Sequence, residues 1–312
     1  MNRFIQWLPD RVDGRIRVFA WLSFVAEVVI IATGGAVRLT GSGLGCPTWP
    51  TCTADSLITT PEMGIHGLIE FGNRMMTGVV GLIALALFVL VWRIRSQRRD
   101  LFVLAFIVGA GIVAQAIVGG ITVWTGLNPF IVGFHYVSSL LLVCVCAAFL
   151  VRMDAQPGPR ELAVPGWYAG LTHATTGVLA LTIVFGILTT GSGPHSGDAA
   201  AGRNGFESEV LEHVHAWPGY ALLALTVVLL IGAWGLRLPT LRWVGALLVV
   251  ELVQIAVGLY QARNGLPPLA VGVHMVLAAL TAATMTVVVL HLKRPATTGA
   301  APAAAPAAAS AR

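Results

Sequence analysis

Two stretches of the chain match each other without a gap, and each ends in a histidine. The first runs from Gln115 to His135 and the second from Gln254 to His274, with Gln, Gly, Gly-Leu, Pro, Val-Gly and His recurring in register. Imidazole is the commonest metal ligand among side chains. A duplicated chain that keeps such a histidine in both copies is expected to bind the same kind of group twice.

A second pair of matched positions lies upstream. The segment Glu70-Phe-Gly-Asn73 aligns with Glu212-His-Val-His215. His66 and His213 or His215 fall near the outer ends of the second helices, and His135 and His274 near those of the fourth. Each half can therefore offer one histidine from its second helix and one from its fourth, at the same depth. Two facing imidazoles can ligate one metal from opposite sides, and in a helical bundle without carboxylate-rich metal motifs this metal is expected to be a heme iron. The sequence contains no Cys-x-x-Cys-His motif, so the heme would not be attached covalently.

The two halves differ at one of these positions. Asn73 stands where the second half has His215, and asparagine is a poor ligand for heme iron. His66, about two helical turns before Asn73, is one candidate to replace the missing ligand. The alternative is a first site that binds its porphyrin more loosely. In the second half the pattern predicts a bis-histidine heme site, with His213 as an alternative to His215.

The first half also carries Glu70 and Arg74, an i, i+4 pair within an apolar segment. Ionisable groups inside a membrane are costly and usually mark function or a paired structural lock. In the functional interpretation, Glu70 exchanges protons or stabilises a carbocation beside the porphyrin, and Arg74 balances its charge or meets a propionate. In the structural interpretation, the pair is a salt bridge along one helix. Glu27 and Glu251 are given no chemistry.

Long apolar runs must position these residues. The chain has 312 residues, 56% of them hydrophobic and 11% charged, and a mean hydropathy of +0.82. These values are typical of a polytopic membrane protein and unlike those of soluble domains. Eight runs are long enough to span a bilayer as helices: roughly 17–37, 66–92, 101–122, 131–151, 167–190, 213–236, 242–260 and 271–292.

The spacing of the matched motifs predicts two tandem four-helix bundles in a parallel repeat, because four spans separate equivalent positions. The N-terminal bundle would occupy residues 17–151 and the C-terminal bundle residues 167–292. Residues 1–16 and 152–166 are expected to form a cytoplasmic N-terminus and linker. An Ala/Pro-rich segment, residues 293–312, is expected to be a disordered cytoplasmic tail.

The basic residues orient these helices. Fifteen of the nineteen Lys and Arg residues fall on one side if both termini are cytoplasmic. The positive-inside rule therefore predicts that both termini lie inside and that the histidines lie near the outer face. The net charge of +5 follows from this bias and does not indicate nucleic acid.

The four cysteines are of two kinds. Cys46 and Cys52 lie in the first outside loop, where an oxidising compartment makes a disulfide plausible; the alternative is two free surface thiols. Cys144 and Cys146 fall within the fourth span and are expected to pack as apolar residues.

Several of these segments together resemble the heme A synthase family, and the resemblance covers about residues 17–292. It rests on Gly35-Ala-Val-Arg-Leu-Thr-Gly-Ser-Gly-Leu-Gly-Cys-Pro-Thr-Trp-Pro50, Ile69-Glu-Phe-Gly-Asn-Arg74, His135 and Gly193-Pro-His-Ser-Gly-Asp198. The resemblance implies a bacterial plasma-membrane enzyme that oxidises a methyl group of heme O to a formyl group by successive hydroxylations, giving heme A for terminal oxidases. It also implies a heme O synthase as upstream partner and an electron donor, which the sequence does not identify.

The resemblance also implies site residues. His215 and His274 would be the axial ligands of a heme b, and His135 would hold or adjoin the substrate heme. Glu70 would be the catalytic carboxylate, and Cys46 and Cys52 would form the loop disulfide. The family pattern Glu-x-x-His-Arg reads Glu70-Phe-Gly-Asn-Arg74 here, so the substrate site departs from it and His66 becomes a candidate for the missing role.

Two other functions compete with this reading. A diheme cytochrome would transfer electrons without altering its heme, and the paired histidines alone suit it equally well. A transporter or structural membrane protein would carry no heme. The asymmetry at Asn73 and the buried Glu70 favour the enzyme, because a pure carrier has little use for either.

Overall fold

Helices dominate the protein. The computed structural model describes residues 6–296, and within this part eight helices are long and apolar enough to cross a membrane. They are α2 (Gly14–Leu39), α3 (Gly64–Val91), α4 (Arg99–Trp124), α5 (Pro129–Met153), α6 (Gly166–Ser192), α7 (Ser208–Gly235), α8 (Leu241–Arg263) and α9 (Pro268–Leu290). The 3-10 turn η1 (Pro61–Met63) precedes α3. The prediction of an all-α, multi-pass membrane protein with eight spans is confirmed.

All eight helices begin before the predicted apolar runs. At α2 and α5, polar capping residues account for an earlier start that hydropathy does not detect. The side chain of Asp13 accepts hydrogen bonds from the backbone N–H groups of Arg15 and Ile16, so α2 begins at Gly14 and not at residue 17. Asn128 caps α5 in the same way, and Pro129 occupies its first turn.

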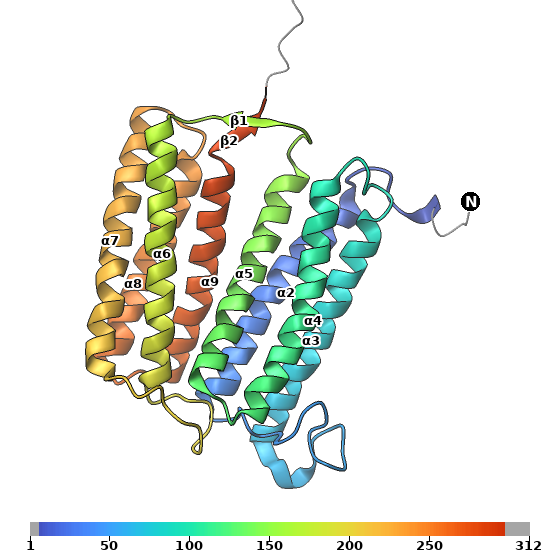
Figure 1. Cartoon of the computed structure of the whole chain (residues 1–312), viewed down its shortest axis with the longest axis vertical. Coiled ribbons are helices and arrows are strands. Elements are labelled where there is room, and N and C mark those ends of the chain that lie inside the picture. Colours follow the sequence, from blue (N-terminus) through green and yellow to red (C-terminus); the bar gives the residue numbers. More distant parts are fainter. Residues whose placement is uncertain (1–5, 297–312) are drawn as a thin grey trace, which may run out of the picture.

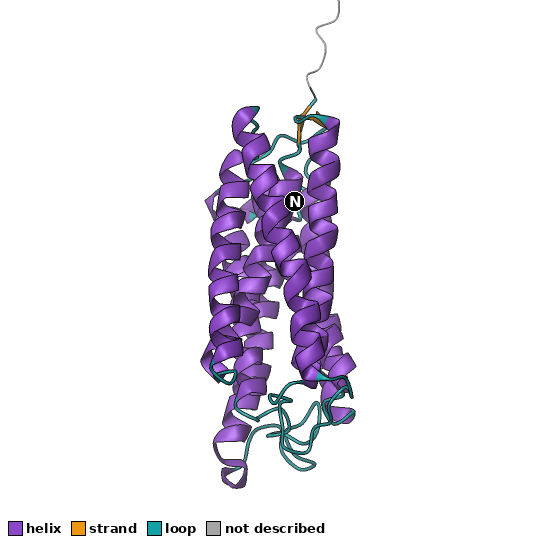
Figure 2. Cartoon of the chain, turned by 90° about the vertical axis from the view of Figure 1, so that its left-hand side faces the viewer, coloured by secondary structure: helices purple, strands orange, loops and turns teal. Residues whose placement is uncertain are grey.

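The helices stand side by side as roughly parallel rods, with loops at both ends (Figure 2). Helices α2 to α5 gather on one side of the molecule and α6 to α9 on the other (Figure 1). Within each group, neighbours in sequence pack against each other. The predicted site histidines, Glu70 and Arg74 therefore all belong to one of two adjacent groups of four helices, and Cys46 and Cys52 lie in the loop between α2 and η1.

Helices α2, α5 and α9 join the two groups. Ile31 of α2, Val143 of α5 and Ala279 of α9 share one buried cluster. The hydroxyl of Tyr136 donates a hydrogen bond of 2.7 Å to the carbonyl of Met275, across the same boundary. Small residues and a buried polar contact hold helices together in an apolar environment, where burial alone gives little driving force.

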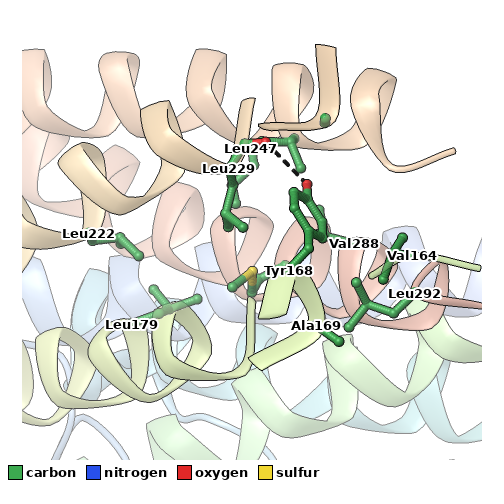
Figure 3. Close-up of a cluster of buried hydrophobic side chains, with 12 residues drawn as sticks. Val164, Tyr168, Ala169, Leu179, Leu222, Leu229, Leu247, Val288 and Leu292 are labelled. Atoms are coloured by element: carbon green, nitrogen blue, oxygen red, sulfur yellow. Dashed lines mark hydrogen bonds between the residues drawn. The ribbon is translucent and has the colours of Figure 1, made fainter. Parts of the chain in front are cut away.

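Closely packed apolar side chains fill one end of the second group (Figure 3). Tyr168 lies among them, fully buried, and its hydroxyl donates to the carbonyl of Leu229 at 3.2 Å. At this end, strand β1 (Arg160–Leu162) pairs antiparallel with strand β2 (Lys293–Pro295). The core is therefore solid at the end that carries the strands, and the candidate site lies toward the opposite end.

The structure describes only part of the two predicted terminal segments. Residues 1–5 of the N-terminal segment and 297–312 of the tail lie outside the described residues. Of the expected tail, Lys293–Pro295 form β2, so this part of it is ordered by backbone pairing with the segment between α5 and α6.

Candidate functional site

A large, mainly apolar cavity extends between the two groups of helices. Residues from α2 to α9 line it, and among them are three of the predicted site histidines, His135, His215 and His274. Asn73, the position that differs between the halves, lines it too. The packing of α2, α5 and α9 thus brings the candidate sites of both halves to one shared space.

In the second half, His215 of α7 and His274 of α9 face each other. Their ring centres are 6.2 Å apart, and their planes are nearly perpendicular, at 82°. The Nδ1 atom of His215 lies 2.9 Å from the backbone carbonyl of Thr182 on α6. Because a carbonyl only accepts, Nδ1 of His215 carries the hydrogen, and Nε2 is left as the basic nitrogen.

Two glycines make room for these imidazoles. A Cβ atom at Gly186 would lie 2.8 Å from Cε1 of His215, and one at Gly258 would lie 3.1 Å from Cε1 of His274. Any larger residue at Gly186 would therefore displace the ring, and one at Gly258 would crowd it. In addition, the Gln254 amide donates 3.1 Å to the carbonyl of His274. The second-half histidines are held by backbone and glycine contacts from neighbouring helices.

The first half repeats part of this arrangement around His135. The Gln115 amide donates a 2.8 Å hydrogen bond to the His135 carbonyl, as the Gln254 amide does to the His274 carbonyl. Gly119 lies next to the ring, although a Cβ there would be 3.6 Å from Cε1, an ordinary contact. Nδ1 of His135 is buried and has no hydrogen bond partner within the described residues.

Asn73 completes the first half differently. Its side-chain oxygen accepts a 2.7 Å hydrogen bond from the hydroxyl of Thr33 on α2. His215 bonds to a threonine of the first helix of its own half, but there the acceptor is the backbone carbonyl of Thr182. The position on the second helix is thus tied to the first helix in both halves. Only the second half presents an imidazole there.

Glu70 lies outside this cavity, under the first loop. Its side chain is 5% exposed, and Oε2 accepts a 2.6 Å hydrogen bond from the backbone N–H of Cys46. Oε1 forms an ion pair of 2.5 Å with Arg74. Both carboxylate oxygens are therefore engaged, and Glu70 is absent from the described residues that line the cavity.

Arg74 is engaged in the same network. Its guanidinium donates to the carbonyls of Cys46, Thr48 and Thr51, at 2.9 to 3.1 Å. The predicted disulfide between Cys46 and Cys52 is present and closes this loop. Together, the ion pair and the disulfide fix the loop over the N-terminal end of α3.

The remaining predicted histidines lie apart from the cavity. His66 is exposed, and its Nδ1 lies 2.9 Å from the Ser42 hydroxyl. The structure does not bring it together with His135. His213 is also exposed and lies 2.8 Å from the Glu209 carbonyl of its own helix, and of the two alternatives His215 is the one that lines the cavity.

Two cavity residues had been given no chemistry from the sequence. Glu27 of α2 and Glu251 of α8 both line the cavity and are 2% and 3% exposed. Each has one buried carboxyl oxygen without a hydrogen bond partner in the described part of the chain. In the sequence, each of these residues is an acidic residue inside an apolar run. That pattern does not reveal which side of the helix faces a cavity.

Comparison with known proteins identifies the family of the chain. The family model of cytochrome oxidase assembly proteins matches residues 17–195. A heme A synthase of Halalkalibacterium halodurans is 27% identical over 299 residues, which cover 89% of this chain and 97% of that protein. A heme A synthase of Lysinibacillus sphaericus is 36% identical over 49% of this chain and 45% of its own length. One of Listeria monocytogenes is 28% identical over 54% of each. The chain therefore belongs to the heme A synthase family of cytochrome oxidase assembly proteins.

Proposed function

We propose that this protein converts heme O to heme A, with a heme b held in the second half and the substrate heme bound in the first. The observation that carries the proposal is one cavity lined by a facing histidine pair in one half, and by His135 and Asn73 in the other. An enzyme needs this inequality, because its cofactor must stay while its substrate must leave.

The residues of the second half fit a bis-histidine heme. The imidazoles of His215 and His274 face each other with ring centres 6.2 Å apart, so these two residues would hold the heme iron. The hydrogen on Nδ1 of His215 also leaves Nε2 available as the ligand atom. When bound, this heme b would supply one-electron redox chemistry.

The first half fits a heme that is held less firmly. His135 offers a ring nitrogen, and Gln115 fixes its backbone. Asn73 is a weak ligand that is already bonded to Thr33. A single strong ligand suits a substrate that is released as product, and the apolar cavity wall would keep bulk water from the reacting methyl group.

The reaction itself balances as two hydroxylations. Each would insert one oxygen atom of O₂ into a C–H bond of the methyl group, use two electrons from a membrane reductant and two protons, and release one water. The second hydroxylation gives a geminal diol, which loses water to give the formyl group. The protein contributes positioning and exclusion of water.

Glu70 and Arg74 contribute through the loop. Both oxygens of Glu70 and most of the Arg74 donors are bonded to the loop or to each other. These contacts support a role in fixing the Cys46–Cys52 loop beside the first half, more than direct contact with the porphyrin. The proposal gives His66 no ligand role.

The wider setting forms part of the proposal. The basic residues would place both termini in the cytoplasm of a bacterial cell and the heme sites near the outer face of the plasma membrane. Heme O would come from a heme O synthase in the same membrane, and an electron donor would supply the reductant. A diheme electron-transfer protein is the second candidate, because the histidine pair suits it equally.

One experiment separates these functions. Pigments are extracted from cells that make heme O, with and without this protein, and separated by chromatography. Heme A that appears only with the protein supports the enzyme. Bound heme with heme O unchanged would favour the electron-transfer protein, and a purified protein without any heme absorption would contradict both.

A further inference from the structure

The strongest unexplained feature is one face of α8 that borders the cavity. Glu251, Gln254, Gly258 and Gln261 are spaced by three, four and three residues, so they lie on one side of the helix. At a rise of 1.5 Å per residue they cover about 15 Å along its axis. The three polar residues among them line the cavity that the two halves share. We call Glu251, Gln254 and Gln261 the α8 stripe.

Each residue of the α8 stripe has a buried acceptor oxygen that receives no hydrogen bond from the described residues. These atoms are Oε2 of Glu251 and Oε1 of both glutamines. Buried polar atoms are rarely left without a partner, and a row of them beside a cavity is where bound water or a mobile proton is accommodated. A row of three on one helix face indicates a polar path through an otherwise apolar wall.

Glu251 is the inner end of this path. It is 3% exposed, and its other oxygen, Oε1, accepts a 2.9 Å hydrogen bond from Thr226 on α7. No Lys or Arg pairs with Glu251 in the described part of the chain. An ionised carboxylate at this depth costs several kcal/mol unless a positive charge lies nearby. Its charge is therefore strongly coupled to the charge of whatever the cavity holds.

Other titratable groups face the same cavity. Helix α8 packs against α7 and α9. The titratable side chains that line the cavity besides Glu251 are Glu27 and Arg38 of α2, His135 and Tyr136 of α5, His215 of α7 and His274 of α9. Glu27 is the one other carboxyl among them, and Thr226 of α7 donates the hydrogen bond that Glu251 accepts.

The outer end of the α8 stripe reaches a second cavity. Gln261 lines it together with His195 and Glu212, and it shares Gln254 and His274 with the first. The path therefore leads from the loop end of α8, past His274, to Glu251.

The first half has no such path. The aligned positions on α4 are Ile112, Gln115 and Thr122. The Gln115 amide bonds to His135 and Ser139, and the Thr122 hydroxyl donates to the Gly119 carbonyl. The α8 stripe is thus specific to the half with the histidine pair.

We propose that Glu251 takes up one proton when the heme held by His215 and His274 takes up one electron, and that the α8 stripe carries this proton. The single net positive charge that a ferric heme would bring to the cavity would stabilise the Glu251 carboxylate. When an external reductant removes that charge by supplying one electron, a carboxylate oxygen of Glu251 would take up a proton from water and the side chain would become the neutral acid. One electron and one proton enter, so the charge of the cavity does not change. The inference rests on the heme b site of the proposed function.

The test is a redox titration of the purified full-length protein with its bound heme, using dithionite as reductant at several pH values. The midpoint potential is expected to fall by about 59 mV per pH unit, because a tenfold change in proton concentration is matched by one electron. In Glu251→Gln the potential should no longer depend on pH. Glu27→Gln is the matched control, a second buried cavity carboxyl on another helix, and should keep the wild-type slope.

A second measurement needs no variant. The infrared difference spectrum between reduced and oxidised wild-type protein should gain a carboxylic acid C=O band on reduction. A pH-independent potential in the wild type, or a slope that survives in Glu251→Gln, would overturn the inference. Heme O conversion measured in parallel separates the two proposals. Heme O conversion with a pH-independent potential would contradict only proton uptake by Glu251. A pH-dependent potential without conversion would contradict only the proposed enzyme activity. A purified protein without heme would contradict both proposals.

Discussion

The two halves keep the same support for a histidine but differ in what stands opposite it. In both, a glutamine amide bonds to the carbonyl of the histidine on the last helix, and a glycine lies beside the ring. Opposite this histidine, the second half has His215 and the first has Asn73. The glutamine and glycine contacts around the last-helix histidine can therefore stay the same while the second potential ligand changes. One half would hold its heme firmly, and the other would release it.

The largest effects should come from removing the histidines themselves. We expect His274→Ala to abolish bound heme b, because His215 alone would be left as ligand. His135→Ala should keep heme b and stop heme A formation. The absorption spectrum of the purified protein and the extracted pigments measure the two effects. Loss of heme b in His135→Ala would break the assignment of one heme to each half.

Restoring the missing ligand should make the halves alike. In Asn73→His the first half gains an imidazole opposite His135, so we expect the substrate heme to be retained during purification. The ratio of heme to protein should rise toward two, and turnover should fall because product release slows. Heme quantitation and a time course of heme A formation give both values. An unchanged ratio would mean that position 73 does not face the bound heme.

The Glu70–Arg74 ion pair, which fixes the Cys46–Cys52 loop, should affect heme O conversion without affecting heme b. Glu70→Gln removes the charge that pairs with Arg74, and breaking a buried ion pair typically costs about 3–5 kcal/mol. We expect heme A formation to drop strongly and the thermal midpoint to fall, while heme b remains. His66→Ala is the matched control, four residues earlier on the same helix but exposed, and should leave conversion unchanged. Loss of all heme in Glu70→Gln would show that this ion pair stabilises the whole helical bundle.

The smallest predicted effects concern the glycines beside the rings. Gly186→Ala would place Cβ 2.8 Å from the His215 ring, whereas Gly119→Ala would place it 3.6 Å from the His135 ring. We therefore expect Gly186→Ala to lower heme b retention several-fold and Gly119→Ala to have little effect on conversion. Heme content after purification measures the first, and the rate of heme A formation measures the second. Equal effects would mean that the two rings are held with similar tightness.

Much of the fold could be predicted from the sequence. Hydropathy located all eight spans because an apolar helix of sufficient length is a local property of the chain. Helix ends were missed by a few residues where Asp13 and Asn128 provide caps that hydropathy ignores. Repeat alignment also singled out His135, His215 and His274, because the glutamine and glycine contacts that recur in space recur in sequence.

The roles of the acidic residues depended on the tertiary structure. Glu70, Glu27 and Glu251 look alike in sequence, each a lone acid in an apolar run. Packing directs Glu70 to the Cys46–Cys52 loop and leaves the other two facing the cavity.

The sequence by itself determined that this chain has eight helices long and apolar enough to span a membrane, because composition is carried by neighbouring residues. It also predicted, through the internal repeat, which histidines would bind a heme. Only the tertiary structure decided which of these side chains meet. The facing of His215 and His274, and the α8 stripe beside them, arise from contacts between helices far apart in the chain. A polar residue's role in a membrane protein depends on which helix face is turned inward, and that is set by how all the helices pack.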